Sequence, residues 1–185
     1  QSMLRFGNLL ASNEIENERF QIHEIFPKPL FIKFFSIKKI RKWAGYLDKY
    51  LLFPKWMNRY FKSLYKPIDL VHIIDHSNAP YFSVIKKLSP AKRIITCHDL
   101  IAVQNSLGEF PLAPKTSRSG QQLQKWILNS LKNAHHFACD SNQTRKTLNR
   151  IHHGSEPNSS VVHLGTDSIL DSVKGETLAL PFDPP

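Results

Sequence analysis

Residues 92–100, KRIITCHDL, give the clearest indication of how this chain folds. Two basic residues lead into a short apolar run that is typical of a buried strand, and His98 and Asp99 follow where the run ends. A histidine beside a carboxylate at the end of a strand is either ordinary loop chemistry or part of a reaction site. The choice depends on the fold, because open parallel sheets bind ligands beyond the carboxyl ends of their strands.

Short apolar runs recur along the chain and alternate with segments of helical spacing. This alternation predicts an α/β fold, a Rossmann-like doubly wound parallel sheet with flanking helices. The predicted strands are residues 20–26, 69–74, 93–97, 136–140 and 160–164. The predicted helices are residues 3–10, 81–88, 120–133 and 142–150, with Ser2 and Ser141 as N-caps of the first and last. We expect a long loop at 101–118, and two or three helical pieces within 30–66 that are broken near Pro54.

The composition is that of one globular domain of 185 residues, 41% hydrophobic and 22% charged. The sequence holds no apolar run of about 18 to 20 residues that would span a bilayer, and its first ten residues lack the features of a signal peptide. Cys97 and Cys139 each end an apolar run, which predicts two reduced, buried thiols. We therefore expect a cytoplasmic protein, in a peripheral position on the inner face of the membrane if it binds lipid.

The positive charge is concentrated in residues 28–66. This segment holds eleven Lys or Arg and one acid, Asp48, so it accounts for the whole net charge of +10. Aromatic residues are interleaved with the cations, as in segments that settle on anionic membrane surfaces. A solvated helical face that covers a core stays open as an alternative, and nucleic acid is a disfavoured one. The residues expected to meet the membrane are Lys38, Lys39, Arg41, Lys42, Trp43 and Trp56.

Polar residues follow three of the predicted strands, and they form the candidate site. His76, His98 with Asp99, and Ser141 would meet at one edge of a parallel sheet, although loops after strands are commonly polar in any case. The histidine pairs lack metal-ligand spacing, so no metal is expected. The sequence has no Gly-x-Ser-x-Gly elbow, Gly-x-Gly-x-x-Gly fingerprint or Walker loop, which disfavours a hydrolase triad and a phosphate cradle within the chain.

Four segments, taken in order, resemble the N-terminal domain of the family-four retaining glycosyltransferases of the GT-B fold. They are DLVHIIDHS (69–77), KRIITCHDL (92–100), NAHHFACDSNQTRKTL (133–148) and SVVHLGTD (160–167). The resemblance covers residues 68–167. It implies a domain at 1–167 whose first strand lies upstream, and an interdomain linker at 168–185 that leads into a C-terminal half.

The resemblance implies a hexosyltransferase that moves a sugar from a nucleotide-sugar donor to a glycan or lipid-linked acceptor with retention, without a metal or other cofactor. This chain would be the acceptor-binding half, and it is expected to be inactive without the C-terminal domain that holds the donor. His98 would lie near the transferred sugar, with Asp99 orienting it or the loop. The implied substrate-binding residues are Ser2, Arg5, His76, Ser141 and Arg145. The alternative is a non-catalytic module that docks on a membrane surface or nucleic acid through residues 28–66.

Overall fold

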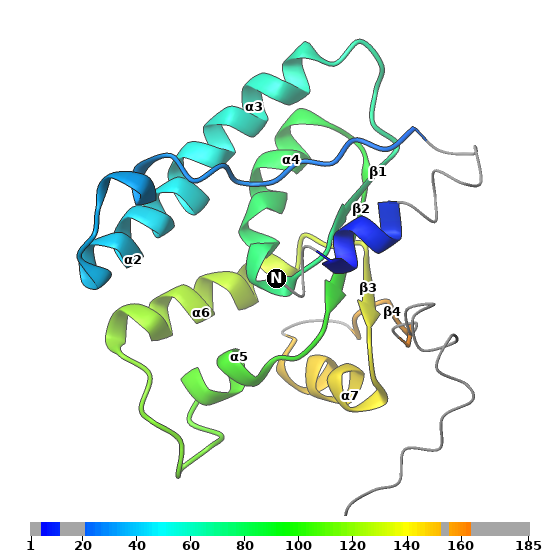
Figure 1. Cartoon of the computed structure of the whole chain (residues 1–185). Coiled ribbons are helices and arrows are strands. Elements are labelled where there is room, and N and C mark those ends of the chain that lie inside the picture. Colours follow the sequence, from blue (N-terminus) through cyan, green and yellow to red (C-terminus); the bar gives the residue numbers. More distant parts are fainter. Residues whose placement is uncertain (1–4, 12–20, 153–155, 164–185) are drawn as a thin grey trace, which may run out of the picture.

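A parallel four-stranded sheet forms the centre of the molecule (Figure 1). The structure, a computed structural model, describes residues 5–11, 21–152 and 156–163. The strands are β1 (Leu70–Ile73), β2 (Lys92–Cys97), β3 (His136–Cys139) and β4 (Ser159–Val161), and each pairs with the next in the order β1-β2-β3-β4. The register places Ile73 beside Ile95 and Cys97 beside Cys139.

Helices connect each strand to the next, as parallel pairing requires. A 3-10 helix, η3 (His76–Tyr81), and α4 (Phe82–Leu88) link β1 to β2. Two helices, α5 (Ile101–Ser106) and α6 (Arg118–Leu131), link β2 to β3, and α7 (Asn142–Ile151) links β3 to β4. The mixed α/β class and the parallel sheet flanked by helices are confirmed. The order of the described strands contains no reversal, so a doubly wound sheet stays a prediction.

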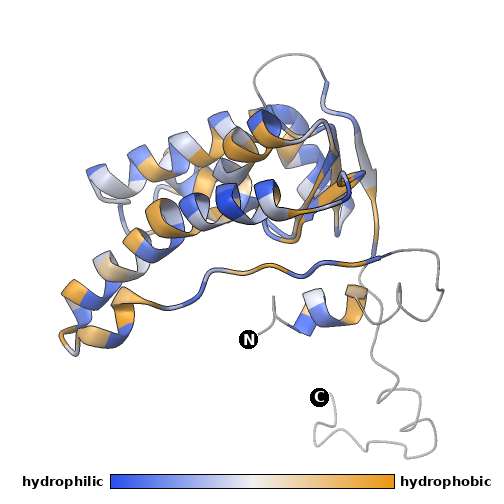
Figure 2. Ribbon diagram, turned by 90° about the horizontal axis from the view of Figure 1, so that it is seen from above, coloured by the Kyte–Doolittle hydropathy of each residue, from blue (hydrophilic) through white to orange (hydrophobic). Residues whose placement is uncertain are grey.

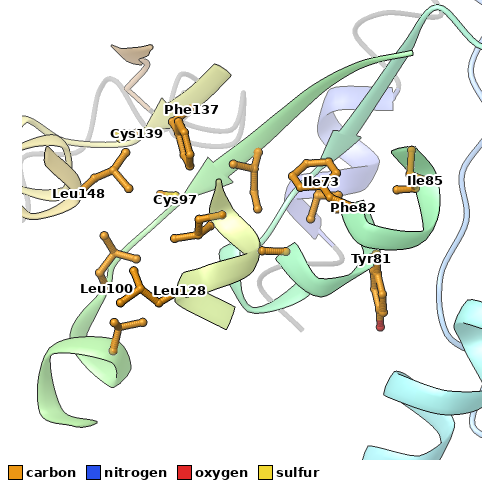
Figure 3. Close-up of a cluster of buried hydrophobic side chains, with 14 of the residues drawn as sticks. Ile73, Tyr81, Phe82, Ile85, Cys97, Leu100, Leu128, Phe137, Cys139 and Leu148 are labelled. Carbon is orange, nitrogen blue, oxygen red and sulfur yellow. The ribbon is translucent and has the colours of Figure 1, made fainter. Parts of the chain in front are cut away.

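One face of the sheet carries the hydrophobic core (Figure 3). Side chains alternate between the two faces of a strand, so Ile73, Ile95 and Phe137 point together toward α4, α6 and α7. Phe82 and Leu131, from two of these helices, are fully buried in the same cluster. Cys97 and Cys139 are buried there as free thiols, as the sequence predicted, and burial raises the pKa of both.

The opposite face of the sheet is more polar. Nε2 of His72 lies 2.8 Å from Oγ1 of Thr96, and Nε2 of His136 lies 2.8 Å from Oγ of Ser160. The helix of residues 5–11 packs at the carboxyl end of this face, where the Phe6 ring contacts His98. Figure 2 shows this short helix apart from the helices that cover the core face.

The basic segment differs from its prediction, because no break occurs at Pro54. After a 3-10 helix, η1 (Phe31–Phe34), the chain is helical through α2 (Lys38–Leu47), the π-helical turn η2 (Asp48–Leu52) and α3 (Phe53–Ser63). Proline lacks an N–H and its ring crowds the preceding turn. Pro54 lies in the first turn of α3, and the amide of Phe53 bonds back to Asp48, so the wider turn absorbs the strain.

Two further predictions are wrong. Residues 21–29 form no strand, although their apolar and polar residues alternate, because they pair with no strand of the sheet; Nδ1 of His23 instead lies 2.8 Å from the hydroxyl of Tyr60 on α3. The expected loop at 101–118 contains α5, which buries Val103 fully. Among the described residues no helix combines the length and hydrophobicity that crossing a bilayer requires.

Candidate site at the carboxyl edge of the sheet

The carboxyl ends of β1, β2 and β3 lie at one edge of the sheet, because the three strands are parallel. Asp75 and His76 follow the first of them, His98 and Asp99 follow the second, and Asp140 and Ser141 follow the third. The amide of Asp140 donates to the carbonyl of Cys97 at 3.3 Å, which holds the last two strand ends together. The ends therefore form one continuous rim of polar residues.

The His98 ring is held between two strand ends. Nε2 lies 3.0 Å from the carbonyl oxygen of Ile74, and because a carbonyl can only accept, this nitrogen carries a proton. Nδ1 lies 3.6 Å from Oδ2 of Asp140, and the ring of Phe6 meets the imidazole edge to face at 5.1 Å. The side chain is 12% exposed, so its orientation is fixed by protein atoms on three sides.

Thr144, in the first turn of α7, joins the ends of β2 and β3. Its hydroxyl lies 3.0 Å from the carbonyl oxygen of His98, 3.1 Å from Oδ1 of Asp140 and 2.9 Å from Oγ of Ser141. Ser141 caps the helix, since its Oγ accepts from the amide of Thr144 at 3.1 Å. The N-cap predicted from the sequence is confirmed, and it places the start of α7 against the His98 backbone.

The rim continues to β1 through Asp75 and His76. Oδ1 of Asp75 accepts from the amide of Ser77 and Oδ2 from its hydroxyl, while Nζ of Lys49 donates to the same hydroxyl at 3.2 Å. His76 is 9% exposed, and its Nδ1 lies 3.4 Å from Oδ1 of Asp75 but makes no hydrogen bond. A buried polar atom without a partner is uncommon in folded proteins and often marks a position that a ligand satisfies.

Burial lowers the pKa of His76, and the nearby carboxylates of Asp75 and Asp99 offset part of this effect. Burial also lowers the pKa of the Lys49 ammonium, against the attraction of Asp75. Asp75 itself has a lowered pKa: burial acts to raise it, but the two hydrogen bonds from Ser77 and the charges of His76 and Lys49 prevail. The rim at β1 therefore favours a neutral imidazole beside an ionised carboxylate.

The remaining residues expected in the site are more scattered. Asp99 is exposed, and its Oδ1 accepts from the amide of Ile101 at 3.1 Å, so it fixes the loop that begins α5. Arg145 turns toward β4, where its Nε donates to Oγ of Ser159 at 3.1 Å. Arg5 lies in the helix of residues 5–11, and Ser2 lies outside the described residues.

The residues that sequence reasoning missed are Asp140 and Thr144. Asp140 follows β3 directly, as His98 follows β2, so the strand-end argument would have found it. Thr144 could be found only through the helix cap, because its role depends on α7 lying against the His98 carbonyl. The carboxylate nearest the His98 ring is thus Asp140, which the candidate list from the sequence did not contain.

The described residues contain no group of three or more His, Cys, Asp or Glu side chains that could hold a metal ion. A cavity of about 60 Å³ lies away from the rim, between the segment 26–30 and the π turn η2. Its lining residues include Phe26, Leu52 and Trp56.

The buried histidines predict that acid destabilises the fold. The pKa values of His72 and His76 are both lowered by burial, so the folded state binds fewer protons than the unfolded chain below the unfolded value of 6.5. Stability is therefore complete above about pH 6.5 and decreases as the pH falls through the lowered folded-state values. The lowered pKa of Asp75 adds a separate loss of stability, which begins only when the pH falls below the ordinary carboxyl pKa of 3.8.

Thermal unfolding followed by circular dichroism across this pH range should show a melting temperature that falls with acidification. The His76→Asn protein should show a weaker dependence. A melting temperature that is constant or rises as the pH falls below 6.5 would contradict the burial of these rings.

Comparisons of the chain with protein-family models, with curated proteins and with solved structures found no match.

Proposed function

We propose that this chain is the acceptor-binding half of a retaining glycosyltransferase that uses a nucleotide-sugar donor. The observation that carries the proposal is the meeting of His98, Asp140 and Thr144 at the carboxyl edge of a parallel sheet. These residues come from two of the four segments on which the resemblance rests, and Ile74, which binds the His98 ring, comes from a third. A ligand site at this edge agrees with the general behaviour of open α/β sheets.

In the proposed reaction an acceptor hydroxyl replaces the nucleoside diphosphate on the anomeric carbon of the sugar. His98 has a fixed ring with a proton on Nε2, so it can donate to a sugar oxygen when the bond to the Ile74 carbonyl is exchanged. A hydrogen-bond donor that meets the oxygen on which charge develops lowers the barrier of the reaction. The Asp140 carboxylate beside Nδ1 acts as the positioning residue for this ring.

His76 would contribute to acceptor binding. Its buried Nδ1 has no hydrogen-bond partner, and the lowered pKa favours the neutral ring, so one of its two nitrogens is an acceptor for a hydroxyl. Asp99, exposed beside it, adds a second acceptor on the solvent side of the rim. A polyhydroxylated ligand is well matched to such alternating donors and acceptors.

The proposal is tested with the protein encoded by the complete reading frame that contains these residues. It is incubated with a panel of nucleotide sugars, each carrying a radioactive sugar, and with a total lipid and glycan extract as acceptor. We expect label from at least one donor to enter the acceptor fraction. If a known transferase labels the same extract while this protein labels nothing from any donor, the proposal is overturned.

A further inference from the structure

An exposed apolar surface projects from one end of the molecule. It extends from Leu30 through η1 and the turn after it to Trp43 in α2, and we call it the apolar tip. Its exposed fractions are large for hydrophobic side chains, reaching 80% for Phe34, 64% for Ile37 and 57% for Trp43. Figure 2 shows hydrophobic residues at this end of the structure, at the left of the view. The tip consists of Leu30, Phe31, Phe34, Phe35, Ile37, Ile40 and Trp43.

Hydrogen bonds to a buried carboxylate hold the apolar tip in place. Asp48, the first residue of η2, is only 4% exposed and accepts hydrogen bonds from the amides of Phe31 and Ile32 at 2.9 and 3.0 Å. It thereby fixes η1 at the end of α2. On the side of α2 toward η1, a Cβ added at Gly45 would lie 3.3 Å from the Ile32 side chain. Ile40 and Trp43 are three positions apart, so they lie together on the helix surface, and both are exposed.

The charge around the tip has one sign. Nine Lys or Arg side chains in residues 28–66 are exposed in the structure, and the acid of that segment, Asp48, is buried in the contact with η1. No exposed carboxylate from this segment therefore offsets the cations. Those nearest the tip in the sequence are Lys33, Lys38, Arg41 and Lys42; Lys39 also lies in α2, but its side chain is outside the described residues.

We propose that the apolar tip inserts into the surface of a membrane that contains anionic phospholipid. Apolar rings and aliphatic side chains gain from the boundary between headgroups and acyl chains, and a cationic face gains from lipid phosphates. Each Lys or Arg near an anionic leaflet adds to the attraction. The tip supplies both features on one rigid element, so charge complementarity identifies the lipid surface as its occupant.

Nucleic acid fits this surface less well. Proteins that bind single strands offer the faces of aromatic rings to the bases. Here the rings on α3 stack on each other, with 11° between the planes of Phe53 and Trp56 and 13° between Trp56 and Tyr60. The tip itself exposes aliphatic Ile37 and Ile40 beside its rings, and such groups have no stacking partner in a base. A second copy of the chain would bring two strongly cationic surfaces together.

The basic segment is also connected to the rim of the candidate site. Nζ of Lys49 donates to Oγ of Ser77, and the hydroxyl of Tyr50 donates to the carbonyl of Ser77 at 3.3 Å. Binding of the tip to lipid would therefore orient the carboxyl edge of the sheet relative to the membrane. Membrane insertion does not depend on the proposed transferase activity, because it rests only on the tip and its charges.

The test measures binding to vesicles of phosphatidylcholine alone and of phosphatidylcholine mixed equally with phosphatidylglycerol. We expect binding to the mixed vesicles, and a blue shift of Trp43 emission in a protein that carries Trp56→Phe and Trp126→Phe. Two variants should each bind the mixed vesicles about a hundredfold more weakly, because each removes three side chains that each contribute about tenfold or less to the vesicle affinity. They are Phe34→Ser with Ile40→Ser and Trp43→Ser, and Lys38→Glu with Arg41→Glu and Lys42→Glu.

A matched control carries Lys87→Glu, Lys92→Glu and Lys132→Glu. These substitutions change the net charge by the same amount as the charge variant of the tip, but on exposed residues outside residues 28–66. This protein should keep most of its vesicle binding, and circular dichroism should show that all three variants fold. Equal loss in the control and the tip variants would overturn the proposal. It would also be overturned by an unshifted Trp43 emission, by tighter binding to a single-stranded oligonucleotide, or by self-association that the tip substitutions abolish.

Discussion

Replacing Phe82 with alanine is expected to lower the free energy of unfolding by about 3 to 5 kcal/mol, the usual cost of removing a fully buried phenylalanine ring. Phe82 has no exposed surface and lies at the start of α4, where its side chain enters the core between the sheet and the helices (Figure 3). Truncation removes the transfer free energy of the ring and leaves a cavity that rigid neighbours cannot fill. Since domains of this size are stable by only about 5 to 15 kcal/mol, a large share of the stability should be lost.

Phe34→Ala provides the matched control, because it makes the same chemical change at a side chain that is 80% exposed. Its effect should lie within about 0.5 kcal/mol. Equilibrium unfolding in urea measures both values. Similar losses for the two proteins would mean that Phe82 is not in the core or that the apolar tip is covered in solution.

Replacing Asp48 with alanine is expected to cost about 2 to 3 kcal/mol, because hydrogen bonds to a charged group are among the stronger ones in proteins. The carboxylate is buried and binds the amides of Phe31 and Ile32. Without it the amides of Phe31 and Ile32 lose the acceptor that the first residue of η2 provides, and the apolar tip separates from the helix. The amides of Phe31 and Ile32 should then exchange with solvent much faster.

Hydrogen exchange at these two amides, combined with urea unfolding, separates a local opening of η1 from a global loss of stability. Asp69→Ala is the control, since Asp69 is exposed and should change the free energy of unfolding by less than about 0.5 kcal/mol. Protected amides in the Asp48→Ala protein would show that η1 is held by its hydrophobic contacts alone.

The sequence was sufficient for β1, β2 and β3 because each is a largely apolar run that a polar residue follows within two positions. Runs around Ile73, Ile95 and Phe137 are buried as predicted, and α4, α6 and α7 begin near the expected residues, whereas α5 was not predicted. The segment at 21–26 has the same local pattern but no partner strand, and strand formation requires one. Local alternation alone could not reveal that difference.

The helices of the basic segment show a second limit. Pro54 is a sound signal for a helix end, but here the helix continues through it, because the wider π-helical turn η2 directly before it accommodates the proline. In the sequence Asp48 is a single acid among many cations, and nothing marks it as buried. In the structure it binds the amides of Phe31 and Ile32, which lie 17 and 16 residues earlier in the chain. Contacts of this kind are tertiary and leave no periodic signal.

The candidate site was predicted in outline and not in detail. Its location follows from the parallel sheet, and His98 lies at the predicted edge. The partners of that histidine are the Ile74 carbonyl, Asp140 and the ring of Phe6, and two of these could be identified only from the structure, since a backbone carbonyl and a packed ring carry no sequence mark.

The most direct test of the central claim, that this edge is the place of sugar transfer, compares the transfer rates of the His98→Ala and His136→Ala proteins, each made from the complete reading frame. Both changes remove a histidine from the same face of the sheet, but His136 lies at the amino end of β3 and bonds only Ser160 among the interactions described above. We predict that His98→Ala slows transfer by about a hundredfold or more, as expected for the loss of a fixed donor, while His136→Ala transfers at nearly the original rate. Equal rates in the two proteins would contradict the claim.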